Sequence, residues 1–198
     1  MKLLKLSSAL LLMGLISVSA IAQKIKLIEG DLSPLKGETA LGIKFVYDNM
    51  KVGKFDQESE YIAKKTEEYN KKEPGRGDNW AKSWVRDREE RFEPKFIDLF
   101  QKETEMTVSR KKPAKYTLVF KTIFTEPGYY IYVSKKNARI DAEAWIVETA
   151  NDKVIAKISV EKVPGRTFGG YDYDTGVRIA ECYADAGKHL GKFIKKKS

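Results

Sequence analysis

The sequence predicts an α+β fold: a single mixed sheet of about four to five strands with three to four helices packed on it, in the order β-α-α-β-β-β-α. Two observations predict this class. Between residues 55 and 104 apolar residues recur at helical spacing, whereas between 116 and 160 they alternate at every second position. A last helical pattern follows over roughly 174–195. Because no repeat or long linker divides it, the stretch 23–198 is expected to form one mature domain.

Composition excludes several classes of protein. The 198 residues include 37 Lys and Arg against 28 Asp and Glu, for a net charge of +9, and 11% are aromatic, which is typical of a folding chain. One cysteine, Cys182, excludes an internal disulfide and a cysteine-based zinc site. One histidine, His189, excludes histidine-pair metal sites and is expected to lie at the surface beside Asp185. We expect no metal and no cofactor.

The first 22 residues have the pattern of a signal peptide. Lys2 and Lys5 precede an apolar stretch over 9–18 that is too short to span a bilayer, and small residues at 20–22 suit cleavage before Gln23. Cleavage two residues earlier is the alternative. No cysteine follows the site, so lipidation is not expected. The predicted location is therefore secreted or periplasmic.

The first half of the mature chain is predicted to be mainly helical. Residues 23–37 read as a leader rich in turn formers, and alternation over 39–47 predicts a half-buried strand. A helix is predicted over 55–72, a break at 73–77, and a second helix over 79–92 that continues after Pro94. Trp80 and Trp84, four apart, are expected to pack in the core; stacking on a sugar or a base beside the following arginines is the alternative.

The second half is predicted to build the rest of the sheet and a last helix. Strands are expected over 116–124, 140–146 and 154–160, with a tight hairpin turn at 151–152 and an optional strand in the aromatic run 129–133. In the last helix a stripe of small residues is expected to pack closely on the sheet. This stripe comprises Ala180, Ala184, Gly187 and Gly191. Cys182 lies beside it and is expected to be buried.

The glycine-rich loop 165–176 is the candidate ligand-binding site. Its candidate residues are Arg166, Gly169, Gly170, Tyr171, Asp172 and Asp174. Glycines allow close backbone approach, and the loop opens a helix whose N-terminus favours anions. The two aspartates disfavour phosphate and resemble the start of a calcium loop, although the rest of such a loop is absent. A plain connection with carboxylates complementing the helix dipole is the structural alternative.

Exposed aromatics and a basic tail are the candidate partner-binding residues. They are Tyr129, Tyr130, Tyr132, Lys195, Lys196 and Lys197. The lysines favour an anionic partner such as lipid headgroups or a wall polymer, and a solubilising surface is the alternative. Because the chain is expected to be secreted, no nucleic-acid partner is expected, and no transmembrane segment is expected after the signal. The oligomeric state is not predicted.

The stretch 171–180, with the small-residue terminal helix that it opens, resembles a group of secreted bacterial envelope proteins. The predicted layout is similar to the periplasmic domains of the curli-secretion lipoprotein and of lipoprotein activators of penicillin-binding proteins. The chain differs from these families in lacking a lipidation cysteine and in its longer helical insertion over 55–104. The resemblance implies a non-enzymatic binding or accessory module.

The sequence thus favours a secreted or periplasmic, non-enzymatic cell-envelope binding or accessory protein that acts through protein or anionic-polymer contacts. One alternative is a small-ligand or calcium-binding protein that uses the loop 165–176. Another is a hydrolase without a recognisable motif, with paired carboxylates drawn from 55–105. Most of those acids are expected on solvated helix faces beside lysines, which argues against hydrolysis.

Overall fold

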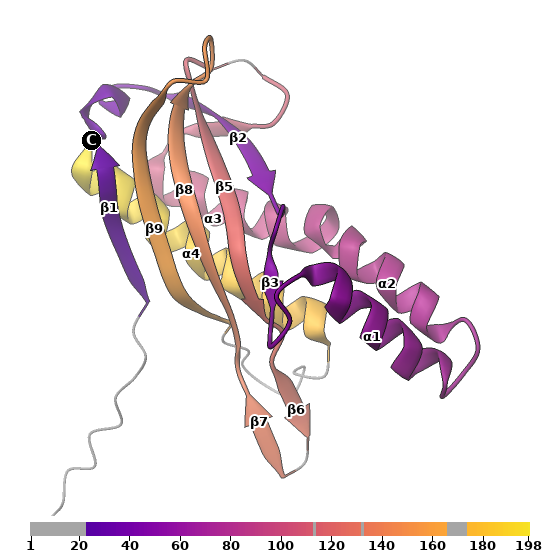
Figure 1. Cartoon of the computed structure of the whole chain (residues 1–198). Coiled ribbons are helices and arrows are strands. Elements are labelled where there is room, and N and C mark those ends of the chain that lie inside the picture. The colour runs from indigo at the N-terminus through magenta and orange to yellow at the C-terminus, as the bar shows by residue number, and fades with distance from the viewer. Residues whose placement is uncertain (1–22, 113, 132, 166–173) are drawn as a thin grey trace, which may run out of the picture.

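A computed structural model describes residues 23–112, 114–131, 133–165 and 174–198 (Figure 1). The predicted signal peptide lies outside these residues. The elements, in chain order, are β1 (Lys24–Gly30), the short 3-10 turn η1 (Ser33–Leu35), β2 (Ala40–Val46), β3 (Lys51–Val52), α1 (Glu58–Asn70), α2 (Arg76–Asp87), a π-helical turn η2 (Arg88–Phe92), α3 (Glu93–Thr104), β4 (Thr107–Ser109), β5 (Tyr116–Glu126), β6 (Tyr129–Ile131), β7 (Ser134–Lys136), β8 (Ala138–Glu148), β9 (Val154–Gly165) and α4 (Thr175–Lys197).

The α+β class with one mixed main sheet is confirmed. The strands run in the order β1-β9-β8-β5-β2-β4, and β3 also pairs with β5. The strands β2 and β3 run parallel to β5, whereas β8 is antiparallel to both β5 and β9. The described sheet therefore has seven strands, where the sequence predicted four to five. The difference comes from β1, β3 and β4, which are short or at the edge and show little alternation.

The predicted leader over 23–37 is wrong in its first half. Residues Lys24–Gly30 form β1, which pairs antiparallel with β9. Its alternation is short: Ile25 and Leu27 pack partly buried against the core, and the strand ends in exposed residues beside the turn formers. Backbone hydrogen bonds to β9 and these two side chains hold the strand in place.

Helices α3 and α4 lie across one face of the sheet, and the core is between these two layers (Figure 1). Phe96 of α3 is fully buried against Phe120 of β5, with ring centroids 4.6 Å apart. The small-residue stripe of α4 does not serve the purpose that we predicted. A side chain at Gly187 would collide with the backbone of Phe96, so this glycine lets α4 approach α3 and not the sheet.

The helices α1 and α2 form an antiparallel pair beyond one edge of the sheet (Figure 1). Helix α2 begins at Arg76 inside the predicted break, because Gly75 adopts the left-handed conformation that admits the turn. Trp80 and Trp84 pack together at 5.6 Å between ring centroids, and Trp84 is 6% exposed. The core-packing interpretation of these tryptophans is therefore the one that the geometry supports.

A half-buried ion pair links the helical pair to the segment after β2. Arg88 contacts Glu58 at 2.5 Å, and the side chain of each is 17% exposed. Trp84 donates its indole N–H to the same carboxylate at 2.6 Å, and the Arg88 guanidinium lies 4.2 Å from the ring centroid of Tyr47 in the segment after β2. Desolvation raises the pKa of Tyr47 well above its ordinary value, so this hydroxyl stays protonated.

Cys182 is fully buried, as predicted, and is not disulfide-bonded. Burial raises the pKa of its thiol, which keeps it protonated and unreactive in the folded protein. Among the described residues no helix is both long and apolar enough to cross a membrane.

Candidate functional site

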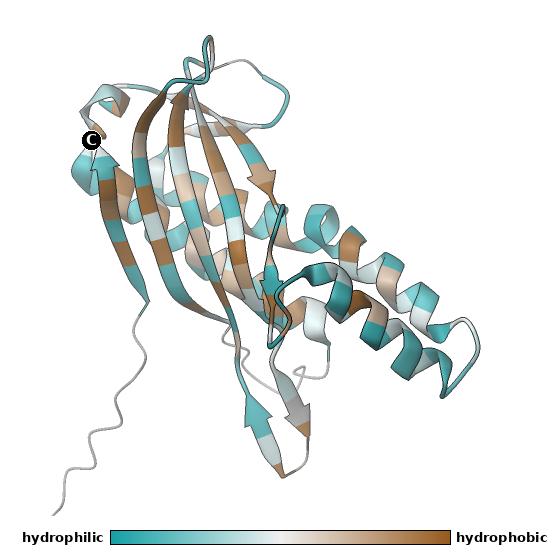
Figure 2. Cartoon of the chain, in the orientation of Figure 1, coloured by the Kyte–Doolittle hydropathy of each residue, from teal (hydrophilic) through white to brown (hydrophobic). Residues whose placement is uncertain are grey.

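A small β-hairpin projects from the main sheet. Strands β6 and β7 pair only with each other and extend past the ends of β5 and β8, away from the C-terminus (Figure 1). The segment around the turn is hydrophobic, whereas β7 is hydrophilic (Figure 2). Ile131 is 56% exposed and Val133 is 89% exposed. We call these two residues the hairpin tip.

The root of the hairpin is held firmly by the body of the protein. Arg178 of α4 is 4% exposed and donates to the backbone oxygens of Pro127 and Gly128, each at 3.3 Å. Gly128 has a φ of +66°, and a Cβ there would collide with the backbone at Asn137 and with the carbonyl of Lys136. The direction of the hairpin is therefore set by the fold.

Beside the root, the main strands are bulged on the open face of the sheet. The pairing of β5 with β8 shifts between Thr122 and Phe124, and the pairing of β8 with β9 shifts between Ile140 and Ala142. Lys162, in the bulged part of β9, has a φ of +57°. Bulges redirect side chains and are frequent near functional sites.

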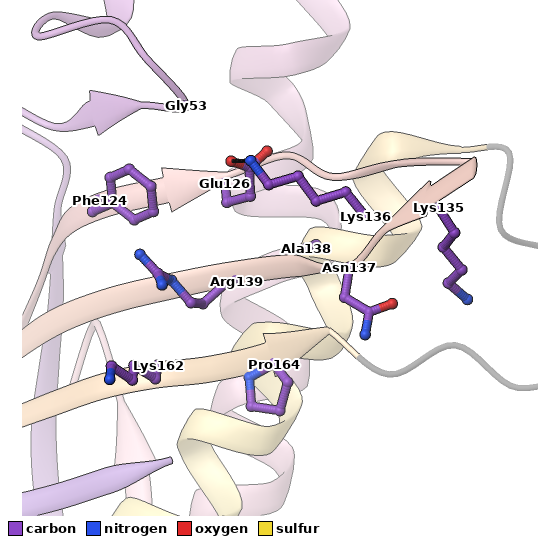
Figure 3. Close-up of a pocket in the computed structure, with 10 residues that line it drawn as sticks. All are labelled: Gly53, Phe124, Glu126, Lys135, Lys136, Asn137, Ala138, Arg139, Lys162 and Pro164. Carbon is purple, nitrogen blue, oxygen red and sulfur yellow. Dashed lines mark hydrogen bonds and ion pairs between the residues drawn. The ribbon is translucent and has the colours of Figure 1, made fainter. Parts of the chain in front are cut away.

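The redirected side chains line an open cavity of 740 Å³, which we call the basal pocket (Figure 3). Its lining residues are Gly53, Phe124, Glu126, Lys135, Lys136, Asn137, Ala138, Arg139, Lys162 and Pro164. Four of these carry a positive charge and one carries a negative charge. The β7 strand supplies two of the cations, so the hairpin and the pocket share a wall. The pocket therefore has an excess of positive charge.

Arg139 is held in the basal pocket by an aromatic ring and a carboxylate. Its guanidinium lies 4.8 Å from the ring centroid of Phe124, and one of its terminal nitrogens donates to Asp141 at 3.3 Å. The other oxygen of Asp141 accepts the backbone N–H of Lys162 at 2.6 Å, so one carboxylate positions both neighbours. The Nε atom of Arg139 is buried and has no hydrogen-bond partner among the described residues. A guanidinium held in this way is preorganised for an anion.

Lys136 of β7 is tied to the root of the hairpin. It forms an ion pair with Glu126 at 2.5 Å, and the Glu126 side chain is only 17% exposed (Figure 3). The other oxygen of Glu126 accepts the backbone N–H of Gly128 at 3.2 Å. Arg139 and Lys162 are the cations that the main strands β8 and β9 contribute to the pocket.

Most of the predicted ligand loop lies outside the described residues: Arg166, Gly169, Gly170, Tyr171 and Asp172. Asp174 is described, and its carboxylate caps α4 by accepting the backbone N–H of Gly176 at 2.7 Å. Its other oxygen contacts Arg91 at 2.7 Å. Burial alone would raise the pKa of Asp174, but the hydrogen bonds from Arg91 and Gly176 outweigh it and lower that pKa. Asp174 therefore has a structural role at the helix start.

Arg91 also pairs with Asp87, at 3.2 Å, in a cavity of 310 Å³ beside the start of α4. Desolvation raises the pKa of Asp87. The positive charge of Arg91 opposes this rise and the negative charge of Asp174 adds to it, and the net shift is upward. No group of three or more metal-ligating side chains is found in the part of the chain that the structure describes.

The predicted partner-binding residues are not brought together. Tyr129 of β6 is 43% exposed and its hydroxyl lies 3.2 Å from that of Ser134. Tyr130 belongs to the same strand, and Tyr132 lies outside the described residues. Lys195, Lys196 and Lys197 form the last turn of α4, at the opposite end of the sheet (Figure 1), where Lys195 pairs with Glu105 at 2.6 Å. His189 is at the surface beside Asp185, with 3.3 Å between Nδ1 and Oδ1.

The sequence did not reveal the basal pocket. Its central residues Phe124, Arg139 and Lys162 come from three different strands. We predicted those strands from alternation along each one, which does not show how neighbouring strands pair. A bulge adds one residue and changes the face of those that follow, without a sequence signature of its own. The adjoining polar break at 134–137 was visible, but its lysines were not recognised as part of a site.

No family model matches the chain, and no curated protein matches it. Among solved structures, a PelC dodecamer from Paraburkholderia phytofirmans matches with 9% identity and a TM-score of 0.37, covering 83% of this chain and 97% of that chain. A second PelC structure matches with 8% identity and a TM-score of 0.34 over the same shares. Protein XCC0632 from Xanthomonas campestris matches with 14% identity and a TM-score of 0.28, covering 50% of this chain and 53% of that chain. Likenesses at these scores assign neither a family nor a function.

Proposed function

We propose that this protein is a secreted or periplasmic, non-enzymatic accessory protein of the cell envelope that binds an anionic envelope component. The observation that carries the proposal is the projecting β6–β7 hairpin, whose tip exposes Ile131 and Val133 and whose second strand carries Lys135 and Lys136. An exposed apolar group flanked by cations typically marks an interaction surface. The proposed secretion rests on the signal-peptide pattern of residues 1–22.

Charge supports an anionic partner over a neutral one. The chain has a net charge of +9, and removal of the predicted signal peptide would take away only Lys2 and Lys5 among its charged residues. Around the hairpin root, cations outnumber carboxylates in the basal pocket. The apolar tip adds a contact that salt does not screen, so binding is expected to have one salt-sensitive and one salt-resistant part.

Co-sedimentation with isolated membranes and with wall sacculi tests the proposal. The chain is mixed with each fraction at low and high salt, beside the variant Ile131→Ser, Val133→Ser. We expect the wild-type chain to pellet with one fraction and the variant to pellet less. The far-ultraviolet circular dichroism of the variant serves as the control for folding, because both residues lie at the surface. Failure of the wild-type chain to pellet with either fraction would refute the proposal.

A further inference from the structure

The basal pocket has the chemistry of a phosphate site. Arg139 presents a guanidinium whose Nε is buried without a hydrogen-bond partner in the described part of the chain, and Lys162 adds a second positive charge from the neighbouring strand. Phosphate oxygens match the planar fork of a guanidinium, and the Arg139 side chain is 36% exposed beside the cavity.

The fold keeps these cations in place at a cost. Lys162 holds a left-handed backbone, which non-glycine residues rarely adopt, and Asp141 secures it by accepting its N–H. The same carboxylate holds Arg139, while Phe124 supports the guanidinium from its ring face. Two residues thus serve to orient a pair of cations toward an open cavity.

The position of the pocket favours a lipid as the source of the phosphate. The hairpin tip and one wall of the pocket belong to the same β-hairpin. Val133 and Lys136 are three positions apart, which is about 10 Å along a strand. Apolar groups of interfacial proteins enter a bilayer by roughly 5–10 Å, with cations at the headgroups and tyrosines at the boundary. Tyr129 lies between tip and root, 43% exposed. A wall polysaccharide would leave the apolar tip without a partner.

We propose that the Arg139–Lys162 pocket binds the phosphate of an anionic phospholipid headgroup while Ile131 and Val133 enter the adjoining apolar layer. The inference rests on the proposed function and specifies its ligand. No bond is made or broken. Affinity comes from charge and hydrogen bonding at the pocket and from apolar burial at the tip.

Vesicle flotation of the full chain tests the inference. We compare phosphatidylcholine vesicles with vesicles containing one quarter phosphatidylglycerol. Wild-type chain is expected to float only with the second kind. The variant Arg139→Gln, Lys162→Gln is expected to bind about 25-fold more weakly, because each cation near an anionic surface contributes about fivefold. The single variant Lys162→Gln keeps the Arg139–Asp141 pair and is expected to show part of the loss of vesicle binding. It serves as the control for a folding defect in the double variant.

The matched control removes the same charge at the far end of the sheet. Lys111 and Lys112 precede β5, whereas the hairpin follows it, and the 11 residues of β5 separate the two by about 33 Å. Because the Debye length at physiological salt is about 8 Å, the variant Lys111→Gln, Lys112→Gln is expected to float like the wild type. If this control loses as much binding as the pocket variant, the attraction is diffuse and the inference is wrong.

A soluble headgroup analogue distinguishes binding at the pocket from binding to a membrane. Glycerol 3-phosphate is expected to raise the melting temperature of the wild-type chain and not that of the Arg139→Gln, Lys162→Gln variant. If it does so but no vesicle binds, the pocket is a site for soluble phosphate compounds and the lipid part is overturned. If neither binds while sacculi or membranes still pellet the protein through the hairpin tip, the proposed function stands and this inference fails.

Discussion

The contact between α3 and α4 offers a quantitative test of the fold, through the substitution Gly187→Ala. An alanine Cβ at this position would overlap the carbonyl oxygen of Phe96, which is backbone and cannot rotate away. Alanine favours a helix over glycine by about 1 kcal/mol, whereas overpacking a close contact costs typically about 1–3 kcal/mol. Because the obstacle is backbone, we take the upper end of that range, and the net loss is about 2 kcal/mol.

Gly191→Ala is the matched substitution one turn further along α4. Its Cβ would lie 3.0 Å from the Cβ of Glu103 and 3.1 Å from the carbonyl oxygen of Phe100, contacts that a small shift relieves. The gain in helix propensity should nearly cancel this cost, and the expected change in stability is within about 0.5 kcal/mol of zero.

Thermal unfolding followed by circular dichroism measures both substitutions. For a protein of this size, a loss of 1 kcal/mol lowers the melting temperature by about 2–4 °C, so Gly187→Ala should melt about 4–8 °C below the wild type. Gly191→Ala should melt within about 2 °C of it. If Gly187→Ala is as stable as the wild type, or if the two variants are equally destabilised, the close approach of α4 to α3 at Phe96 is refuted.

Three further predictions concern Glu58, Asp174 and Cys182. Glu58→Ala should lower the free energy of unfolding by about 1–3 kcal/mol, because it leaves the half-buried Arg88 guanidinium and the indole N–H of Trp84 without their acceptor. Urea denaturation measures this, and a loss well below about 1 kcal/mol would mean that the pair is solvated. Asp174→Asn keeps the helix cap but removes the charge that Arg91 contacts. The pKa of Asp174 is lower in the folded state than in the unfolded chain. The ionised carboxylate therefore contributes its full stabilisation above the ordinary aspartate pKa, and this stabilisation is lost as the pH falls through the folded-state pKa. The stability difference between wild type and variant should therefore shrink on acidification, and a difference that grows would contradict the shift. Cys182 should react with a thiol reagent such as dithionitrobenzoate only after unfolding in urea, since it is buried and its pKa is raised; fast labelling of the native protein would show that α4 opens.

The α+β class, the central strands and the helices were predictable from the sequence, because their signals are local. Alternation along β5, β8 and β9 and helical spacing along α1 and α4 depend only on which face of an element is buried. Carboxylates that complement the dipole at the start of α4 were one of the two sequence interpretations, and Asp174 lies at that helix start.

Where the edge strands pair and which residues form the candidate site became visible only in the folded protein. Strand β1 has only Ile25 and Leu27 packed against the core, and this short alternation does not show which strand it pairs with. The basal pocket lies beside bulges in β5 and β9, the two strands that flank β8, and brings Phe124, Arg139 and Lys162 together from positions up to 38 residues apart in the chain. A bulge is a property of the pairing between strands, and pairing between distant segments is what a single sequence does not encode locally.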